Sequence, residues 1–530
     1  MTLDARLVVA LMLPAMSAWG QAITVDGTVD GRLSPAQTLV GPNYAIGPNL
    51  GRQVGGNLFH SFGAFGLNRG ETATFSGPAA VANVIGRVTG GAQSSIDGTV
   101  RSTMPGANLY LVNPAGVVFG PNARVDVSGS FHASSADYLR FADGARFQAT
   151  NPAASTLTSA PPAAFGFLTP NPRPVTVNGA TLGPVAGTLG LVGGPVTISG
   201  GVLQAPGGTV HVTSAAGPGE VPVAPRSGPA PTVTGFGPVR VERGARVAVS
   251  DPAGLGSGGS VFIRAGTLDV TASEIDADNH GSGPGGVVSL RGDGAVTISP
   301  GAGDVQPSWA EVRAQSRGGG SSGNIDVTST GPMHIKGSIM TTAYRSGDAG
   351  QIVLQAGSLT ILDAFISTTA YGPGRSGNIE VTAAGSMQVV ASFRAPPLIE
   401  ALKFPATTGD AGRILLRAGN LAIRNTGINN ATYGAGRGGD VTVQADSISL
   451  EQGYIRSGTG GSGQGGDVTV QADSISLQGG SIAGSTIGAG RGGQVAVRAG
   501  NLAISQGGNI TVETSPIFFS PPKPRPLRNP

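Results

Sequence analysis

The chain has 530 residues, of which 89 are glycine, 5% are aromatic and 12% are charged. So few large or charged side chains argue against a series of ordinary globular domains and favour a thin, repetitive core with frequent turns. The formal net charge of +3 comes without any run of five or six like charges, which argues against nucleic acid as a partner.

The amino terminus is typical of a secretory signal peptide. Arg6 precedes the apolar run 7–15, and small residues follow up to Ala22. This run is shorter than the roughly 20 residues that a membrane-spanning helix needs. We predict a signal peptide over residues 1–22, cleaved after Ala22 or alternatively after Ala18, and no transmembrane helix in the mature chain. Cysteine is absent, so an exported product has to be stable without disulfides.

Residues 23–245 alternate short strand-like segments with glycine, without a clean period, and carry several motifs in a fixed order. Together these motifs resemble the amino-terminal haemagglutination activity domain of the filamentous haemagglutinin family. The members of this family are two-partner secretion exoproteins. The motifs are Gly55–Pro78 (GGNLFHSFGAFGLNRGETATFSGP), Val84–Gly91 (VIGRVTGG), Asn108–Phe131 (NLYLVNPAGVVFGPNARVDVSGSF), Ala164–Leu168 (AFGFL) and Leu191–Gly208 (LVGGPVTISGGVLQAPGG).

The resemblance implies a secretion domain that stays unfolded in the periplasm and folds outside as a capped β-helix. Its implied partner is a dedicated outer-membrane β-barrel transporter, which captures the chain through periplasmic domains. The family's Asn-Pro-Asn-Gly turn, tied to secretion, corresponds to Asn113, Pro114, Ala115 and Gly116. Asn113, Pro114 and Gly116 are therefore the expected secretion motif, whereas Ala115 lacks the side-chain amide of the family's asparagine.

The carboxy-terminal half repeats itself. The string GDVTVQADSISL occurs at Gly439 and again, unchanged, at Gly466. Related segments, each starting at a glycine that we call the landmark glycine of its unit, are separated by 27, 37, 27, 27, 35, 27, 27 and 27 residues. The full set of landmark glycines is Gly259, Gly286, Gly323, Gly350, Gly377, Gly412, Gly439, Gly466 and Gly493.

Each repeat unit reads as two or three short strands joined by tight bends. Apolar residues alternate within a unit, as at Ile352 and Leu354 and then Leu359 and Ile361, which is the period of a strand with one buried face. One unit cannot bury that face alone, whereas coiled units stacked in parallel can. We expect glycine at the bends to supply unusual backbone angles, and the 27-residue unit is too short for a propeller blade.

These patterns predict an all-β chain that folds as a right-handed, single-stranded parallel β-helix with an amino-terminal cap. Residues 246–515 form the repeat rod, and the Pro-rich residues 516–530 form a disordered tail. The longer spacings become loops that bulge from the rod, one around Trp309 and one that contains Pro396, Pro397 and Phe404. No separate domain is expected after the rod, so the chain is either a short passenger or a truncated product.

One acidic cluster is a candidate site. Glu274, Asp276, Asp278 and His280 are spaced by two, so a strand would present them on one side. Such a set suits calcium binding or glycan chemistry. The favoured interpretation is an ordinary solvated strand face, because no other unit repeats these acids.

Three arginines form a second candidate. Arg375, Arg437 and Arg491 each lie two residues before a landmark glycine. Stacking brings them to one edge of the rod, where a positive ladder suits sulfated or acidic glycans. Ordinary solubilising loop residues are the favoured alternative, because the arginines skip units and Gln464 interrupts them.

No metal site, cofactor motif or catalytic constellation stands out, so we expect no cofactor, no metal and no enzymatic activity. The expected function is that of a secreted or surface-presented bacterial adhesin, exported through the periplasm and in contact with cell-surface glycans or receptors. Two alternatives remain open: a β-helix enzyme acting on polysaccharides, and a non-adhesive structural protein of the surface or matrix. The receptor, and whether the rod stays tethered, are not set by the sequence.

Overall fold

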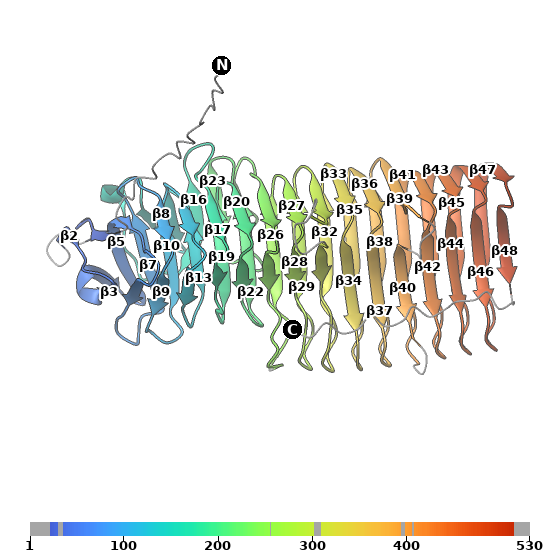
Figure 1. The fold of residues 1–530 in the computed structure, drawn as a ribbon, viewed down its shortest axis with the longest axis horizontal. Coiled ribbons are helices and arrows are strands. Elements are labelled where there is room, and N and C mark those ends of the chain that lie inside the picture. Colours follow the sequence, from blue (N-terminus) through green and yellow to red (C-terminus); the bar gives the residue numbers. More distant parts are fainter. Residues whose placement is uncertain are drawn as a thin grey trace, which may run out of the picture.

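The computed structural model describes residues 22–29, 35–254, 256–301, 309–393, 398–404 and 408–513. They form a long parallel β-helix with its amino-terminal strands at one end and β47 and β48 at the other (Figure 1). The all-β prediction is confirmed. Residues 1–21 of the expected signal peptide, the Pro-rich tail and the loop residues Pro396 and Pro397 lie outside the described residues.

Two sheets run the length of the rod, and each coil contributes to both. Sheet A holds the first two strands of every coil and sheet B holds the third. The strands of sheet A are β1 (Ile23–Val25), β2 (Gln37–Thr38), β4 (Gly51–Val54), β5 (Asn57–Phe65), β7 (Asn83–Val88), β8 (Ser94–Ile96), β10 (Asn108–Val112), β11 (Val117–Phe119), β13 (Phe131–Ser134), β17 (Val175–Asn178), β19 (Thr188–Gly193), β20 (Val196–Ser199), β22 (Thr209–Ser214), β24 (Val239–Glu242), β26 (Ser260–Ala265), β27 (Leu268–Thr271), β29 (Val287–Gly292), β30 (Val296–Ser299), β32 (Asn324–Ser329), β33 (Pro332–Ile335), β35 (Ile352–Ala356), β36 (Ser358–Leu362), β38 (Ile379–Ala383), β39 (Ser386–Val390), β41 (Ile414–Arg424), β43 (Val441–Glu451), β45 (Val468–Gln478) and β47 (Val495–Ser505).

Sheet B forms the opposite wall of the coil. Its strands are β3 (Asn43–Ile46), β6 (Thr72–Phe75), β9 (Thr99–Ser102), β12 (Arg124–Asp126), β18 (Thr181–Leu182), β21 (Val202–Gln204), β25 (Arg246–Ala248), β28 (Glu274–Asp276), β31 (Glu311–Arg313), β34 (Ser338–Ala343), β37 (Phe365–Ala370), β40 (Ile399–Lys403), β42 (Gly427–Thr432), β44 (Tyr454–Thr459), β46 (Ser481–Thr486) and β48 (Asn509–Glu513). From β41 onward the first two strands of each coil merge into one continuous strand of 11 residues.

The repeat units stack in the predicted vertical register. Val441 lies opposite Val468, and Val468 opposite Val495, in parallel pairs of strands. The longer spacing before Gly412 leaves the register intact, because Ile379 still pairs with Ile414. The inward residues of all three strands form one continuous aliphatic core, so each coil supplies the cover that its neighbour needs.

The landmark glycines serve a purpose other than the one expected. They do not adopt positive φ, but they pass very close to the coil before them. A Cβ placed on Gly377 would lie 1.9 Å from the carbonyl oxygen of Gly350. The left-handed corners fall elsewhere, at residues such as Asn425 (φ 57°) and Gln452 (φ 51°) before sheet B. Close approach between coils, and not backbone angle, therefore explains the repeated glycine.

The amino-terminal end is closed by antiparallel pairing. Strands β1 and β4 both pair antiparallel with β5, and β2 pairs antiparallel with β1. The short 3-10 helix η1 (Pro48–Leu50) lies directly before β4 and buries Leu50. These segments cap the first coil and cover its core, as the sequence predicted.

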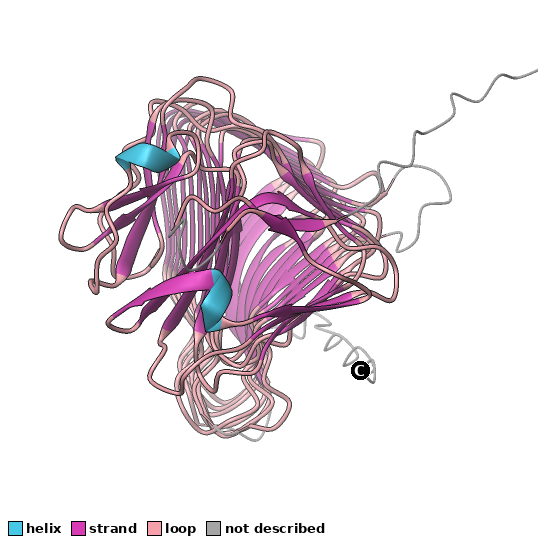
Figure 2. Cartoon of the chain, turned by 90° about the vertical axis from the view of Figure 1, so that its left-hand side faces the viewer, coloured by secondary structure: helices cyan, strands magenta, loops and turns pink. Residues whose placement is uncertain are grey.

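A third sheet, which the sequence did not reveal, lies beside the first coils. Sheet C consists of β14 (Tyr138–Phe141), β15 (Arg146–Gln148), β16 (Pro162–Phe167) and β23 (Gly219–Pro222), all antiparallel. The 3-10 helix η2 (Pro152–Ala154) lies between β15 and β16. Viewed along the rod, these strands stand apart from the coil (Figure 2). Their buried residues form a second core, which includes Phe59 and Tyr110 of sheet A.

No break in the rod marks the expected boundary at residue 245. Strand β22 pairs with β26 and β24 with β27, so the ladder crosses residue 245 without interruption. Sheet C closes earlier, at β23. Among the described residues no helix has the length and apolar character needed to cross a membrane.

Candidate functional site

The expected secretion motif forms a buried turn between β10 and β11. The Asn113 side-chain amide donates to the carbonyl oxygen of Ala92 and to Ser94 Oγ, both at 2.9 Å. Its carbonyl group at Oδ1 accepts the backbone N–H of Ala115, also at 2.9 Å. Asn113 is fully buried. Its side chain therefore both shapes its own turn and holds the preceding coil in place.

Gly116 completes the turn with a backbone that favours glycine. Its N–H donates to the Asn113 carbonyl at 2.9 Å, and its φ is 101°. An added Cβ would lie 2.9 Å from the Pro174 carbonyl oxygen, on the segment that leads into the next coil. Pro114 and Ala115 are partly exposed. The motif is thus a rigid link between three coils, and its two central residues are partly exposed.

Arg87, which lies in the Val84–Gly91 motif, anchors sheet C to the rod; the sequence alone assigned it no role. Its side chain is 1% exposed, and Nε donates to Ser61 Oγ at 2.8 Å. Nη1 donates to the Gln148 carbonyl at 2.7 Å and to Ser155 Oγ at 2.6 Å. Nη2 reaches Thr28 Oγ1 at 2.8 Å. One buried guanidinium thus connects the cap, the first coil and sheet C. The available signal was a single charged residue in a strand that is mostly apolar.

Three histidines lie buried in the same region. Burial lowers the pKa of His60 and of His211 to about 4. Burial, with His211 nearby, lowers the pKa of His132 to about 3. The His132 ring stacks on Tyr110 with 4.7 Å between ring centroids. All three are therefore neutral in the folded domain at ordinary pH.

The acidic cluster is not the solvated face that we expected. Asp276 and Asp278 are 1% and 2% exposed, although Asp276 points outward from β28, next to the core residue Ile275, and Asp278 follows two residues later. Arginines from the coils on either side cover them. Arg246 and Arg313 both form ion pairs with Asp276. Arg313 also pairs with Glu274, with 2.6 Å between Nη2 and Oε1. Arg317 Nε lies 3.2 Å from Asp278 Oδ2. The partners are about one coil apart in sequence, so spacing within one strand could not reveal them.

The electrostatics of this cluster are those of a closed ion-pair network. Burial opposes ionisation of Asp276, but Arg313, Ser250 and Arg246 together lower its pKa to about 2. Burial and the neighbouring Asp276 charge raise the pKa of Asp278. Among the described residues no group of three or more histidine, aspartate or glutamate side chains is placed to hold a metal ion. The arginines occupy the positions that a cation would need.

The three candidate arginines lie along one corner of the rod, but acids alternate with them. In coil order the corner carries Asp348, Arg375, Asp410, Arg437, Gln464 and Arg491. Asp348 Oδ1 accepts the backbone N–H of Arg375 at 2.7 Å, and Asp410 Oδ1 accepts that of Arg437 at 2.9 Å. Arg375 Nη2 lies 3.7 Å from Asp410 Oδ2. The corner is therefore an alternating ladder of charges over most of its length, and Arg491 is exposed on the last coil.

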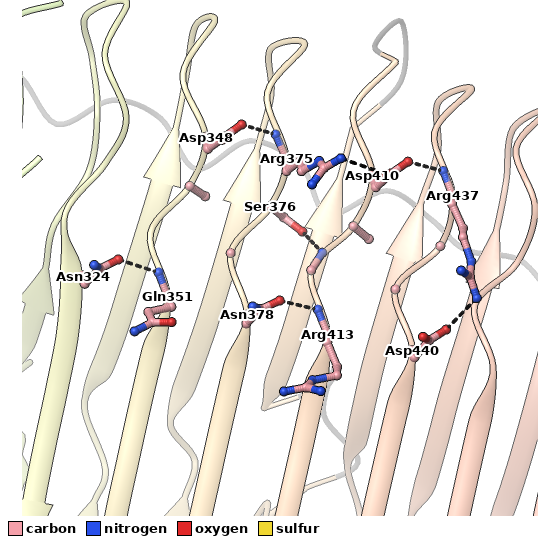
Figure 3. Close-up of a pocket in the computed structure, with 16 residues that line it drawn as sticks. Asn324, Asp348, Gln351, Arg375, Ser376, Asn378, Asp410, Arg413, Arg437 and Asp440 are labelled. Atoms are coloured by element: carbon pink, nitrogen blue, oxygen red, sulfur yellow. Dashed lines mark hydrogen bonds and ion pairs between the residues drawn. The ribbon is translucent and has the colours of Figure 1, made fainter. Parts of the chain in front are cut away.

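Arg375 and Arg437 line a shallow hollow of about 570 Å³ (Figure 3). A second ladder runs along its floor, one residue after each landmark glycine. Asn324 Oδ1 accepts the backbone N–H of Gln351 at 2.9 Å, and Asn378 Oδ1 that of Arg413 at 2.8 Å. Side-chain oxygens of one coil thus satisfy backbone donors of the next. Aligning acids and amides with the arginines by repeat position would have revealed both ladders.

Comparisons with known proteins concern the amino-terminal region most directly. Residues 26–228 match the family model of the TPS secretion domain. Among solved structures, the HMW1 secretion domain from Haemophilus influenzae is similar over 91% of this chain and 97% of its own, at 16% sequence identity and a TM-score of 0.40. None of the curated proteins gives a significant match.

Proposed function

Residues 26–228 are a TPS secretion domain, so the chain is a two-partner secretion exoprotein, and from this we propose that its rod acts as a surface adhesin. The match confirms the family resemblance seen in the sequence motifs. Exoproteins with this domain cross the outer membrane through a dedicated transporter and reach the cell surface or the medium. Export and the transporter partner follow from the family, whereas adhesion is our proposal.

The continuity of the secretion domain with the rod carries this proposal. Parallel pairing runs unbroken from β22 to β26 and on to β47. Folding of the first coils outside the cell therefore offers a template on which every later coil can add. The result is a stiff rod that holds its polar outer ladders away from the secretion domain. A repetitive surface of this kind suits multivalent contact with a cell surface.

Export is tested by secretion with the cognate transporter. Asn113→Ala removes the amide that holds Ala92 and Ser94, so we expect released protein to fall at least several-fold while the periplasmic or cellular pool rises. Asn501→Ala, an exposed residue on the last coil, serves as the matched control and should be released normally. Unchanged release of the Asn113 variant would refute a role for this turn in export.

Adhesion is tested by binding of the purified secreted protein to host and bacterial cells. Saturable binding that glycosidase treatment of the cells reduces supports an adhesin with a glycan receptor, with Arg375, Arg437 and Arg491 as candidate contacts. Incorporation into the extracellular matrix without cell binding would support the structural alternative. Turnover of acidic polysaccharides that is lost in Asp276→Ala would support the enzyme alternative, which the burial of Asp276 disfavours.

A further inference from the structure

A second hollow lies on sheet A, halfway along its last four strands, β41, β43, β45 and β47 (Figure 1). It measures about 730 Å³. Its floor is a row of alanines, one from each strand, namely Ala418, Ala445, Ala472 and Ala499. One wall is formed by the residues before the alanines, which are Arg417, Gln444, Gln471 and Arg498. The other wall is formed by the residues after them, which are Gly419, Asp446, Asp473 and Gly500.

Aspartate replaces glycine in this second wall in two coils. The two identical repeat units carry Asp446 and Asp473, whereas the other seven units carry glycine in the same register, at Gly266, Gly294, Gly331, Gly357, Gly385, Gly419 and Gly500. A Cβ placed on Gly419 would lie 3.1 Å from the Gly385 carbonyl oxygen, and one on Gly500 2.9 Å from that of Asp473. A side chain at this position is therefore crowded, and seven coils form without one.

The charges of the two aspartates are also uncompensated. Both side chains are exposed and lie one coil, about 4.8 Å, apart. Like charges at this spacing on neighbouring strands repel each other. In the described part of the chain, no cation or hydrogen-bond donor pairs with the carboxylate of Asp446 or Asp473. Crowding and repulsion both oppose these acids, so their role lies outside the coil, in contact with a ligand.

The opposite wall supplies amides. Gln444 and Gln471 lie side by side in register, and both side chains are exposed. Arg417 stands at one end of this wall and donates from Nε to Gln444 Oε1 at 3.2 Å. Arg498 stands at the other end, in register with Gln471. A carboxylate accepts two hydrogen bonds at once, and an amide both donates and accepts. With a floor of methyl groups between them, these walls suit a ring that has hydroxyl edges and an apolar C–H face.

We propose that this hollow binds a cell-surface glycan chain that is rich in free hydroxyl groups and carries no anionic group. Neighbouring hydroxyls of the sugar rings donate to Asp446 and Asp473, the glutamines bond hydroxyls on the other edge, and the C–H faces lie over the alanines. The aspartates repel sulfate and carboxylate groups, so this site differs in specificity from the corner that carries Arg375 and Arg437. The site serves the adhesive function proposed above, on which the choice of a cell-surface glycan rests.

A peptide strand fits this hollow less well than a glycan does. Peptides that bind to sheets add to an exposed edge and pair with its free backbone groups. The centre of the hollow lies within sheet A, where β45 already pairs with β43 on one side and with β47 on the other. Recognition there depends on side chains alone, which suits hydroxyl groups on a sugar ring.

Binding of the full-length secreted protein to immobilised dextran, mannan and laminarin tests this site, with dextran sulfate as the anionic counterpart of dextran. The double variant Asp446→Gly, Asp473→Gly restores the glycine of the other units, so its thermal midpoint should equal or exceed that of the natural chain. We expect its Kd for the neutral glycan that the natural chain binds best to rise at least ~10-fold, with dextran sulfate binding unchanged. Failure of the natural chain to bind any of the three neutral glycans, or equal Kd values for both chains, overturns the proposal.

A second double variant and a control exclude general effects of charge and fold. Asp446→Asn with Asp473→Asn keeps the size of both side chains and should also weaken binding, because the amide accepts hydrogen bonds less strongly than the carboxylate. Glu451→Gln removes a 45% exposed carboxylate from the same strand as Asp446 but outside the hollow. This control should bind neutral glycans like the natural chain, and an equal loss in Glu451→Gln would overturn the proposal.

Binding to whole cells separates this site from the adhesive function. If the natural chain binds a neutral glycan through Asp446 and Asp473 but binds no cells, the glycan site stands and the adhesive function fails. If the glycine double variant binds both cells and neutral glycans as well as the natural chain does, the adhesive function stands and this site fails.

Discussion

The guanidinium carbon of Arg87 lies 4.2 Å from the centre of the Phe147 ring, so a residue of the rod stacks on a residue of sheet C. Burial lowers the pKa of Arg87 to about 10, which still leaves the group charged at neutral pH. Cation–π stacking and four hydrogen bonds offset the cost of placing this charge out of water. Sheet C is thus held to the rod by a polar anchor as well as by its apolar core.

Replacing Arg87 should loosen sheet C. Arg87→Met keeps the stem against Phe147 but leaves Ser61, Ser155 and the Gln148 carbonyl without their donor. We expect a loss of about 2–4 kcal/mol in the free energy of unfolding, measured by urea denaturation of the secreted protein. Arg101→Met, whose ion pair with Asp126 is about half exposed, is the control and should cost under about 1 kcal/mol.

Gly116 should tolerate substitution less well than other glycines with positive φ. Gly116→Ala strains a backbone at φ 101° and brings a Cβ to 2.9 Å from the Pro174 carbonyl. We expect a loss of about 2–3 kcal/mol, seen as a lower thermal midpoint. Gly144 has a similar φ of 87°, but a Cβ added there would meet no atom within 4 Å, so Gly144→Ala is the matched control. It should cost about 1 kcal/mol, and equal losses would show that the contact with Pro174 is unimportant.

The secretion domain should lose stability in mild acid because of its buried histidines. A histidine in the unfolded chain has a pKa near 6.5. In the folded domain, burial lowers the pKa of His60 and His211 to about 4 and that of His132 to about 3. The unfolded state then binds more protons. Stability is therefore full above pH 6.5 and falls as pH drops towards 4, by several kcal/mol in total.

Urea denaturation between pH 7.5 and 4.5 measures this effect. His132→Phe keeps an aromatic ring beside Tyr110 and removes one of the titrating groups, so its stability should depend less steeply on pH than that of the natural chain. The exposed His334 lies in the rod, and His334→Phe is the matched control. An unchanged slope for His132→Phe would contradict a neutral, buried histidine at this position.

The sequence predicted the repeating coils, and the family resemblance predicted the amino-terminal cap, but neither revealed sheet C or the contacts that bury side chains between coils. The pairing of Val441 with Val468 could be predicted because identical segments surround the two residues. The antiparallel contact of Phe165 with Val221 in sheet C has no such signal, because β16 and β23 are far apart in the sequence and belong to no repeat. Similarly, Asp276 looked exposed because its covering arginines come from other coils. A pattern within one strand sets which way a side chain points, but the neighbouring coils decide whether it is buried.

The last coil should be the least stable part of the rod. Leu502 is 47% exposed and Ile504 48%, although the equivalent Ile475 and Leu477 one coil earlier are buried. Each coil gains stability mainly from its neighbours, and the β47–β48 coil has a described neighbour on one side only. We therefore expect its amides to exchange with deuterium at least ~10-fold faster than those of β43. Protection equal to that of β43 would show that another surface covers Leu502 and Ile504 in solution. Leu502→Ala should then cost about as much as Ile475→Ala, whereas in an uncovered coil it should cost about half as much.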